Sequence, residues 1–268
     1  MIRAAVLGSP ISHSLSPALH RAAYQTLGLA GEYEAIEVKA GNLAEFIATR
    51  DQTWTGFSLT MPLKEEVLKI ATSVDPLALH IRSANTLLRS GSGWRALTTD
   101  VSGFQHALAA HHIMEFESVL IIGAGATARA AAAACDDSGR QIAIIRRSSN
   151  RDDAMRSAAS KSAISFIEWS GELLPADLVI NTTPSGVADI FLPQVTSQPT
   201  GVFFEALYDP WPTQLLAGWR AYGGQTIDGL DLLVHQGIDQ VALMCQVAVD
   251  RDLLAPLLRA AGLLALAK

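Results

Sequence analysis

The sequence has few cysteines and lacks the residue spacing of a metal site. Two cysteines are present, Cys135 and Cys245, and each stands in an apolar helical pattern. This setting predicts buried free thiols and argues against a disulfide framework. None of the seven histidines has a partner at metal-ligand spacing. We therefore expect no bound metal.

Long hydrophobic runs and an excess of basic residues are also missing. No apolar stretch reaches membrane-spanning length without polar interruption. The chain opens on Met1-Ile2-Arg3 and passes directly into a strand pattern, so we expect no signal peptide and a cytoplasmic protein. The 20 Lys+Arg and 26 Asp+Glu residues leave a net charge of −6, which argues against nucleic acid and a polybasic membrane surface as partners. We expect the partner to be a small-molecule substrate. We expect the protein itself to be a monomer or a homodimer.

What the chain does contain is enough apolar sequence for a large core. Its 268 residues are 49% hydrophobic, sufficient for one large or two modest domains. Strand patterns alternate with helical patterns in both halves, which predicts an α/β fold with parallel sheets. A hairpin is predicted around Ser90-Gly91-Ser92-Gly93.

A glycine turn follows the apolar run at residues 119–122 and precedes an alanine-rich run. Gly123, Gly125 and Ala128 fit the G-x-G-x-x-A fingerprint of dinucleotide-binding proteins. The first glycine allows a sharp turn, and the second lets a pyrophosphate approach the backbone and the free N–H groups of the helix. The predicted cofactor-binding residues of this turn are Gly123, Ala124, Gly125, Ala126 and Thr127. The alternative is a plain structural turn.

No acidic residue follows the next strand pattern, residues 141–145, before Asp152. Enzymes that use NAD usually have Asp or Glu there, roughly 20 residues past the glycines, to hold the ribose 2′-hydroxyl. This chain has Arg146-Arg147-Ser148-Ser149-Asn150-Arg151 instead. Because arginines suit a 2′-phosphate, we expect NADP(H) as the cofactor, with a solvated basic loop as the alternative.

Small polar and charged residues follow the strands of the first half, where an open α/β sheet usually faces its ligand. They are Ser14, Ser16, Thr60, Lys64, Asn85 and Asp100. Each has a structural alternative: Ser16 and Asp100 could cap helices, and Lys64 could be a solvated lysine. A cation in the first turn of a helix is mildly unfavourable, which favours a functional role for Lys64.

The chain resembles the shikimate dehydrogenase family across almost its whole length. The motifs that carry the resemblance are Gly8-Ser9-Pro10-Ile11-Ser12-His13-Ser14-Leu15-Ser16-Pro17, Thr60-x-Pro62-x-Lys64, Ala84-Asn85-Thr86-Leu87, Thr99-Asp100-x-x-Gly103, the Gly123 turn, Asn181-Thr182-Thr183-Pro184-Ser185-Gly186, Tyr208-Asp209-Pro210-x-x-Thr213 and Gly229-x-x-x-Leu233-Val234-His235-Gln236. They run in the family's order, and together they are highly specific.

The resemblance implies NADPH-dependent reduction of 3-dehydroshikimate to shikimate, a step of aromatic amino-acid (chorismate) biosynthesis. It implies that Lys64 and Asp100 form the catalytic pair, since a cation must stand near the oxygen that gains charge. The substrate-binding residues it implies are Ser14, Ser16, Thr60, Asn85, Tyr208 and Gln236. For the cofactor, it implies a 2′-phosphate grip by Arg147, Ser148 and Arg151, with Arg146 in the place of an Asn, and a nicotinamide contact at Gly229.

We therefore expect two domains. Residues 1–103, completed by the C-terminal helices in 230–268, are the expected substrate-binding catalytic domain. Residues 104–229 are the expected Rossmann-type NADP-binding domain.

The chain departs from the family's usual pattern at Ser58, Thr99 and Arg146, each of which stands where the family usually has Asn. Two alternatives to the main function stay open. A relative acting on quinate or another cyclic polyol acid is disfavoured because quinate-oxidising members typically carry an acid after the second strand and use NAD. A non-catalytic NADP-binding regulator is disfavoured because a sensor needs neither Lys64 nor Asp100.

Overall fold

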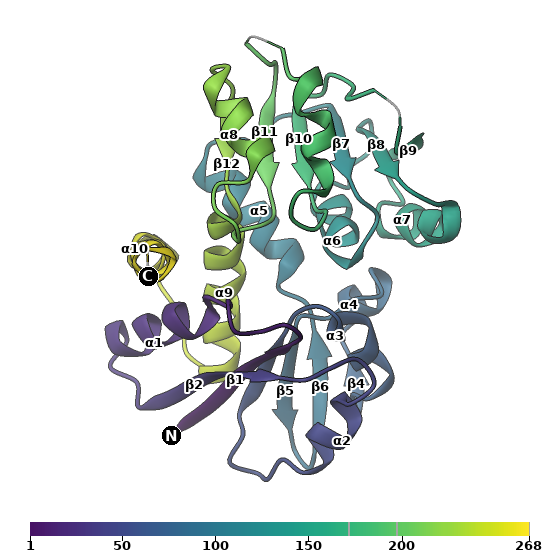
Figure 1. Cartoon of the computed structure of the whole chain (residues 1–268). Coiled ribbons are helices and arrows are strands. Elements are labelled where there is room, and N and C mark those ends of the chain that lie inside the picture. The colour runs from purple at the N-terminus through teal and green to yellow at the C-terminus, as the bar shows by residue number, and fades with distance from the viewer. Residues whose placement is uncertain (171, 197, 268) are drawn as a thin grey trace. The chain divides into compact units, whose positions relative to one another are not determined.

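The computed structural model describes residues 1–170, 172–196 and 198–267 of the chain. These residues form two compact units (Figure 1). Unit 1 comprises Met1–Gly103 and Leu233–Lys268, and unit 2 comprises Phe104–Leu232. Both boundaries fall inside helices, α5 (Asp100–Ala110) and α9 (Gly229–Cys245).

Unit 1 is built on a six-stranded sheet in the order β2-β1-β3-β5-β6-β4. Its strands are β1 (Ile2–Gly8), β2 (Gly31–Glu37), β3 (Gly56–Leu59), β4 (Ser73–Val74), β5 (Thr86–Ser90) and β6 (Gly93–Leu97). The predicted hairpin is present, because β5 and β6 pair antiparallel across Gly91, which has a positive φ. So short a loop can join only antiparallel neighbours. Strand β5 is thus the exception to the expected parallel arrangement, running against both β3 and β6.

Helices cover the sheet of unit 1. Besides parts of α5 and α9 they are α1 (Ser16–Thr26), α2 (Leu43–Ala48), α3 (Leu63–Glu66), α4 (Pro76–His80) and α10 (Arg251–Leu266), with a 3-10 turn η1 (Val67–Lys69). Helix α1 packs against β2 and α10. Aromatic rings fill the core around Phe57, whose ring lies 4.8 Å from that of Trp54 and 5.1 Å from that of Trp94, centroid to centroid.

Helix α1 begins one residue earlier than the capping alternative for Ser16 requires. Ser16 is the first residue of the helix, and the N-cap position belongs to Leu15, which makes no side-chain capping bond. The Ser16 amide instead donates to Ser14 Oγ at 3.4 Å. The capping role considered for Ser16 is therefore wrong, and its buried hydroxyl does not serve that purpose.

Unit 2 is built on a six-stranded sheet in which all strands run parallel, in the order β12-β11-β10-β7-β8-β9. The strands are β7 (Ser118–Ile122), β8 (Gln141–Arg146), β9 (Ala163–Glu168), β10 (Leu178–Asn181), β11 (Val202–Glu205) and β12 (Gln225–Ile227). Counted along this unit, the order is that of the dinucleotide-binding fold, with the direction of chain progression reversing between β7 and β10.

Helices and 3-10 turns connect the strands of unit 2. They are α6 (Ala126–Ala134), η2 (Ser149–Arg151), α7 (Asp152–Ala158), η3 (Val187–Gln194) and α8 (Gln214–Ala221). Ala128 of α6 is fully buried, as expected for a small residue that brings a helix close to its strand. The sequence-based expectation that residues 141–145 pair beside 119–122 is confirmed by the β7–β8 ladder.

Both cysteines are free thiols. Burial raises the pKa of Cys135 to about 12 and that of Cys245 to about 11, so both thiols stay protonated near neutral pH. Within the residues that the structure describes, no helix is long and apolar enough to span a membrane.

Truncating the central ring of the unit 1 core tests this packing. Phe57→Ala should lower the free energy of unfolding by about 3 to 5 kcal/mol, because the ring is fully buried and leaves a cavity. Urea unfolding followed by tryptophan fluorescence measures the change. Leu264→Ala, at a position that is 69% exposed, is the control and should stay within about 0.5 kcal/mol of the parent. Equal unfolding midpoints for parent and Phe57→Ala would contradict the core assignment.

Candidate active site

An ion pair lies at one edge of the unit 1 sheet. Lys64 Nζ is 2.6 Å from Asp100 Oδ2, and the exposed fraction of the side chain is 16% for the lysine and 6% for the aspartate. Lys64 lies in the short helix α3, and Asp100 is the first residue of α5. Because both charges are largely removed from water, each depends on the other for compensation.

The Asn85 side chain connects this ion pair to its surroundings. Its Nδ2 atom is 2.9 Å from Asp100 Oδ1, 2.9 Å from Thr99 Oγ1 and 3.0 Å from Gln236 Oε1. Its Oδ1 atom accepts from the Thr99 amide at 2.8 Å and from Thr86 Oγ1 at 2.9 Å. Asn85 therefore orients both the catalytic candidate Asp100 and the substrate-binding candidate Gln236.

The antiparallel course of β5 is what places Asn85 at this edge. Strands β1, β3 and β6 all end there, whereas β5 begins there, since Ser58 pairs with Thr86 and Thr86 with Leu97. The Leu59 amide donates to the Asn85 main-chain oxygen at 2.7 Å, and the Ala84 amide donates to that of Lys64 at 2.9 Å. The backbone thus holds α3 and the start of β5 side by side.

Gln236 reaches Asn85 because α9 approaches α5 very closely. A Cβ atom at Gly103 would lie 2.8 Å from Gln236 Cβ, closer than real side chains allow. Gly103 therefore has a packing role, in that any larger residue would push α9 and the Gln236 side chain away. The Gln236 Nε2 atom donates to the Leu233 carbonyl at 2.8 Å, which leaves Oε1 directed at Asn85.

Three further predicted residues lie on other loops at the same sheet edge. Ser14 is in the loop after β1, Ser16 opens α1 and Thr60 directly follows β3. The Thr60 amide donates to Leu7 O at 2.9 Å, and a Cβ at Gly8 would lie 2.3 Å from Thr60 Cγ2. Hydrogen bonds gather Lys64, Asn85, Asp100 and Gln236 into one cluster, whereas Ser14, Ser16 and Thr60 are placed only by their loops.

The predicted phosphate turn of unit 2 has the shape that a dinucleotide needs. Gly123 follows β7 with a φ of +108°, and a Cβ there would lie 2.7 Å from Thr182 Oγ1. Gly125 is the N-cap of α6, with Ala126 and Thr127 in the first turn and no side chain capping the helix. These backbone N–H groups at a helix N-terminus suit an anion, and the residues fit a pyrophosphate.

The arginine at the end of β8 and those in the loop after it make different contacts. Arg146 Nε and Nη2 grip Asp152 at 2.7 and 3.1 Å, and Nη1 meets Glu168 at 2.5 Å. Both carboxylates raise the pKa of the Arg146 guanidinium through their hydrogen bonds. Arg147 and Ser148 are exposed. Arg151 extends over the glycine turn, with Nη1 3.5 Å from the Ala124 carbonyl.

The two remaining predicted residues belong to unit 2. Tyr208 lies in the loop after β11, and Gly229 opens α9. A Cβ at Gly229 would lie 2.2 Å from the Leu207 main-chain oxygen, so the absence of a side chain there is already required by the backbone packing.

Sequence reasoning missed a buried carboxyl group in unit 2. Glu205, the last residue of β11, accepts hydrogen bonds from Asn181 Nδ2 at 3.0 and 3.1 Å and from Thr213 Oγ1 at 2.8 Å. Burial nevertheless raises its pKa to about 7, although these donors oppose the change. An acid inside a run of apolar strand residues is the sequence signal that could have drawn attention to it.

Sequence reasoning also missed a set of buried hydrogen-bonded side chains next to the Lys64–Asn85–Asp100–Gln236 cluster of unit 1. Tyr33, Ser58 and Gln240 are buried and joined by hydrogen bonds of 2.6 Å. The signal was a glutamine in the apolar pattern of α9, one helical turn after Gln236.

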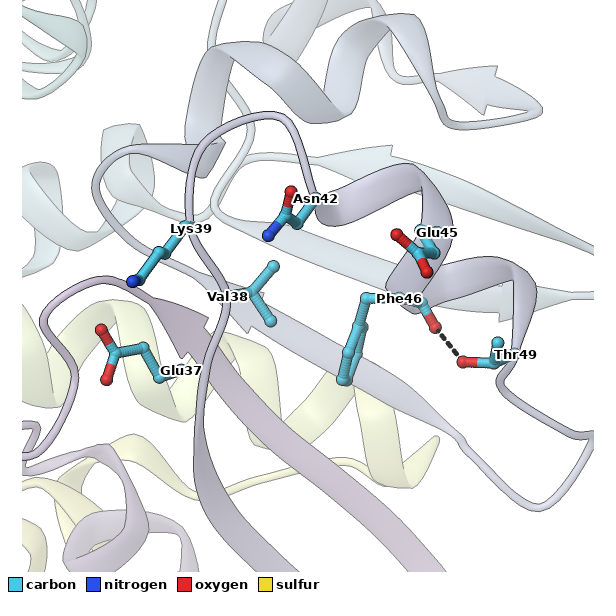
Figure 2. Close-up of a pocket in the computed structure, with 7 residues that line it drawn as sticks. All are labelled: Glu37, Val38, Lys39, Asn42, Glu45, Phe46 and Thr49. Atoms are coloured by element: carbon cyan, nitrogen blue, oxygen red, sulfur yellow. Dashed lines mark hydrogen bonds between the residues drawn. The ribbon is translucent and has the colours of Figure 1, made fainter.

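A shallow groove of about 460 Å³ lies elsewhere on unit 1, between the end of β2 and α2. Figure 2 shows Glu37 and Lys39 at one end and Glu45 and Thr49 at the other, with Val38 and Phe46 between them. None of the predicted site residues lines it. Among the described residues, no group of three or more His, Cys, Asp or Glu side chains could hold a metal ion.

Comparison with known proteins identifies relatives of both units. A family model described as the shikimate dehydrogenase substrate binding domain matches residues 6–87. The shikimate dehydrogenase (NADP(+)) of Thermosynechococcus vestitus is 37% identical over 245 residues, which cover 87% of this chain and 86% of that protein.

Solved structures show the same architecture. The shikimate dehydrogenase of Mycobacterium tuberculosis matches with a TM-score of 0.88 and 34% identity, over 97% of this chain and 100% of that one. The shikimate 5-dehydrogenase of Thermus thermophilus, solved in complex with NADP(H) and shikimate, matches with a TM-score of 0.82 and 30% identity, over 97% of this chain and 100% of that one.

The raised pKa of Glu205 predicts a pH dependence of stability. The folded state holds a proton up to about pH 7, whereas an ordinary glutamate carboxyl loses it near 4.5, so the free energy of unfolding should fall as pH rises through this window, by on the order of 3 kcal/mol in total. Glu205→Gln does not titrate. Calorimetry from pH 5 to pH 8 measures the melting temperatures of variant and parent. The difference, variant minus parent, should increase as pH rises, and parallel curves would contradict the assignment.

Proposed function

This chain belongs to the shikimate dehydrogenase family, and we propose that it catalyses the reversible, NADPH-dependent reduction of 3-dehydroshikimate to shikimate. The observation that carries the proposal is the Lys64–Asp100 ion pair, held by Asn85 beside Gln236 in the unit that carries the family's substrate-binding sequence. A relative matched over 87% of this chain is a shikimate dehydrogenase (NADP(+)), and a related structure holds NADP(H) and shikimate.

We assign the substrate contacts other than Tyr208 to unit 1 and cofactor binding to unit 2, in line with the domains expected at residues 1–103 with 230–268 and at 104–229. The proposed cofactor-binding residues are Gly123, Ala124, Gly125, Ala126, Thr127, Arg147, Ser148, Arg151 and Gly229. When bound, NADPH supplies the hydride for the substrate carbonyl carbon. The N-terminus of α6, which no side chain caps, and the Arg151 guanidinium beside it support this assignment.

Arg146 has an indirect part in this proposal. Its guanidinium is already shared between Asp152 and Glu168, so it neutralises two carboxylates beside the loop that would otherwise repel a 2′-phosphate. Arg147, Ser148 and Arg151 are left to make the direct contacts.

Lys64 is the proposed proton donor. A carbonyl oxygen gains charge as its carbon receives hydride, and a nearby ammonium group both stabilises that charge and supplies the proton. Asp100 accepts hydrogen bonds at both oxygens, from Lys64 and from Asn85, and therefore acts as the acceptor that aims the lysine. After the transfer the Lys64 amine is neutral and takes a proton from water.

The remaining substrate contacts follow from the chemistry of a polyhydroxylated acid. We propose that its hydroxyl and carboxylate groups are bound by Ser14, Ser16, Thr60, Asn85, Tyr208 and Gln236. A site built from hydrogen-bonding groups strongly rejects analogues that lack the matching hydroxyls, because buried polar groups then lose their partners.

A four-way assay tests the function. The purified protein is given shikimate or quinate, each with NADP or NAD, and absorbance of the reduced nicotinamide is followed. We expect rapid reduction of NADP with shikimate, and at least tenfold slower reduction in the other three mixtures. Preference for NAD would overturn the role of the arginine loop, and binding of NADP without turnover of either acid would favour a regulator.

Replacing the lysine should separate chemistry from binding. Lys64→Met keeps the aliphatic stem but removes the charge and the proton, so kcat should fall by about 10² to 10⁴-fold. The Kd for NADP, measured by calorimetry, should stay within about threefold of the parent value. An unchanged kcat would contradict the assignment of Lys64 as the proton donor.

Removing the arginine above the glycine turn should weaken NADP and spare NAD. Arg151→Ala deletes charge-assisted hydrogen bonds to a 2′-phosphate, so the Kd for 2′,5′-ADP should rise about 10- to 100-fold while that for 5′-ADP hardly changes. Arg156→Ala is the matched control, because this arginine packs over the Phe166 ring at 4.8 Å. Equal losses for both nucleotides would show that Arg151 does not recognise the 2′-phosphate.

A further inference from the structure

Beneath the unit 1 cluster runs a line of hydrogen bonds that the proposed reaction has not used. Tyr33 OH donates to Ser58 Oγ at 2.6 Å, and Ser58 Oγ donates to Gln240 Oε1 at 2.6 Å. Gln240 Nε2 then donates to the Asn85 main-chain oxygen at 3.0 Å and to Thr86 Oγ1 at 2.9 Å. Three strands and helix α9 are thereby joined through hydrogen bonds of their side chains.

The line continues into the ion pair. Thr86 Oγ1, which accepts from Gln240, donates to Asn85 Oδ1 at 2.9 Å. Asn85 Nδ2 in turn is 2.9 Å from Asp100 Oδ1, and Asp100 Oδ2 accepts from Lys64. One continuous path of donors and acceptors therefore leads from Tyr33 in β2 to Lys64 in α3.

Two backbone groups determine the direction of every bond along this path. The Asn85 main-chain oxygen can only accept, so the Gln240 amide must present Nε2 to it and Oε1 to Ser58. The Thr99 amide can only donate, so Asn85 must present Oδ1 to it, at 2.8 Å, and Nδ2 to Asp100. Because both carboxamides have one allowed orientation, the hydroxyl of Thr86 between them also has one.

Water cannot replace the members of this path from Tyr33 to Asp100, because they are buried. Gln240 is 1% exposed and Thr86 is fully buried, and a lost bond there leaves an unsatisfied polar group. The imidazole that packs against Tyr33 carries no charge near neutral pH. His20 stacks on the Tyr33 ring at 3.8 Å, and burial lowers the pKa of His20 to about 3, so the imidazole stays uncharged.

We propose that Gln240 is a positioning residue for the dehydrogenase reaction, an inference that rests on the proposed function. It holds the Asn85 main chain and directs the Thr86 hydroxyl onto Asn85 Oδ1. The Thr86 hydroxyl is then a second donor to Asn85 Oδ1, besides the Thr99 amide. Together they keep Asn85 Nδ2 directed at Asp100 and Gln236. Ser58 helps to hold the Gln240 side chain, because its hydroxyl accepts from Tyr33 and donates to Gln240 Oε1.

The spacing of Gln236 and Gln240 in α9 lets one helix both contact the substrate and orient Asn85. Gln240 follows Gln236 by four residues, so both side chains lie on the same helix face. Gln236 is proposed to contact the substrate, and Gln240 orients the Asn85 side chain to which Gln236 is bonded. A small shift of this face would therefore disturb the substrate contact and the ion pair together.

Paired substitutions at Gln240 and Thr86 test the proposal in the full-length protein. Gln240→Leu and Thr86→Val remove the polar groups while nearly preserving volume, and each should lower kcat/KM for shikimate and NADP by about tenfold. Thr86→Ser loses a methyl group but keeps the hydroxyl, so it should stay within about twofold of the parent. The double variant should be no worse than the poorer single variant, because both changes break the same path.

Val241→Ala is the matched control. This neighbour of Gln240 is fully buried, so the substitution should lower the melting temperature and leave kcat/KM within about twofold of the parent. If Gln240→Leu does not fold, Ser58→Ala interrupts the path one residue earlier and should lower kcat/KM in the same direction.

The outcomes distinguish a failure of the Gln240 positioning role from a failure of the proposed dehydrogenase function. A parent enzyme that fails to reduce NADP with shikimate overturns the proposed function and the inference together. An active parent with Gln240→Leu and Thr86→Val within about twofold of it overturns the positioning role alone. The same holds if Thr86→Ser is as impaired as Thr86→Val, or if the two losses multiply in the double variant.

Discussion

Burial of the Asp100 carboxylate is the constraint on which the arrangement of unit 1 depends. A carboxylate with a 6% exposed side chain must find its compensation within the protein. Lys64 compensates one oxygen and Asn85 the other. Asn85 can do so only because β5 runs antiparallel and begins at the edge where β3 and β6 end. The topology of the sheet therefore decides whether this charge can be buried.

The charged side chains of unit 2 have partners of a different kind from those of Asp100 in unit 1. Arg146 lies opposite Glu168 in the β8–β9 ladder and also grips Asp152, so its charge is matched locally. Arg147 and Arg151 keep theirs at the loop surface. Glu205 differs from Asp100 in its partners, since Asn181 and Thr213 are neutral donors, and burial raises the pKa of Glu205 to about 7.

Local patterns predicted the elements well and the roles of single side chains less well. The strand–turn–helix at Gly123 and the hairpin at Gly91 follow from short stretches of sequence, because glycine geometry and apolar alternation act over a few residues. The capping alternative for Ser16 was wrong, since the helix begins at Ser16 itself. Arg146 was predicted among the cofactor-binding residues, and only the folded chain shows that its guanidinium contacts Asp152 and Glu168.

The sequence by itself determined the α/β class, the strand–turn–helix at Gly123, the basic loop and the family, because each of these is recognised from short runs of neighbouring residues. Tertiary structure alone decided which polar groups share hydrogen bonds. Ser58 and Gln240 are separated by 182 positions yet lie 2.6 Å apart, and Asn85 meets Gln236 across a separation of 151. Such contacts depend on strand register and on helix packing at Gly103, which no local pattern encodes. The direction of each bond then follows from backbone donors and acceptors that only the folded chain brings into place.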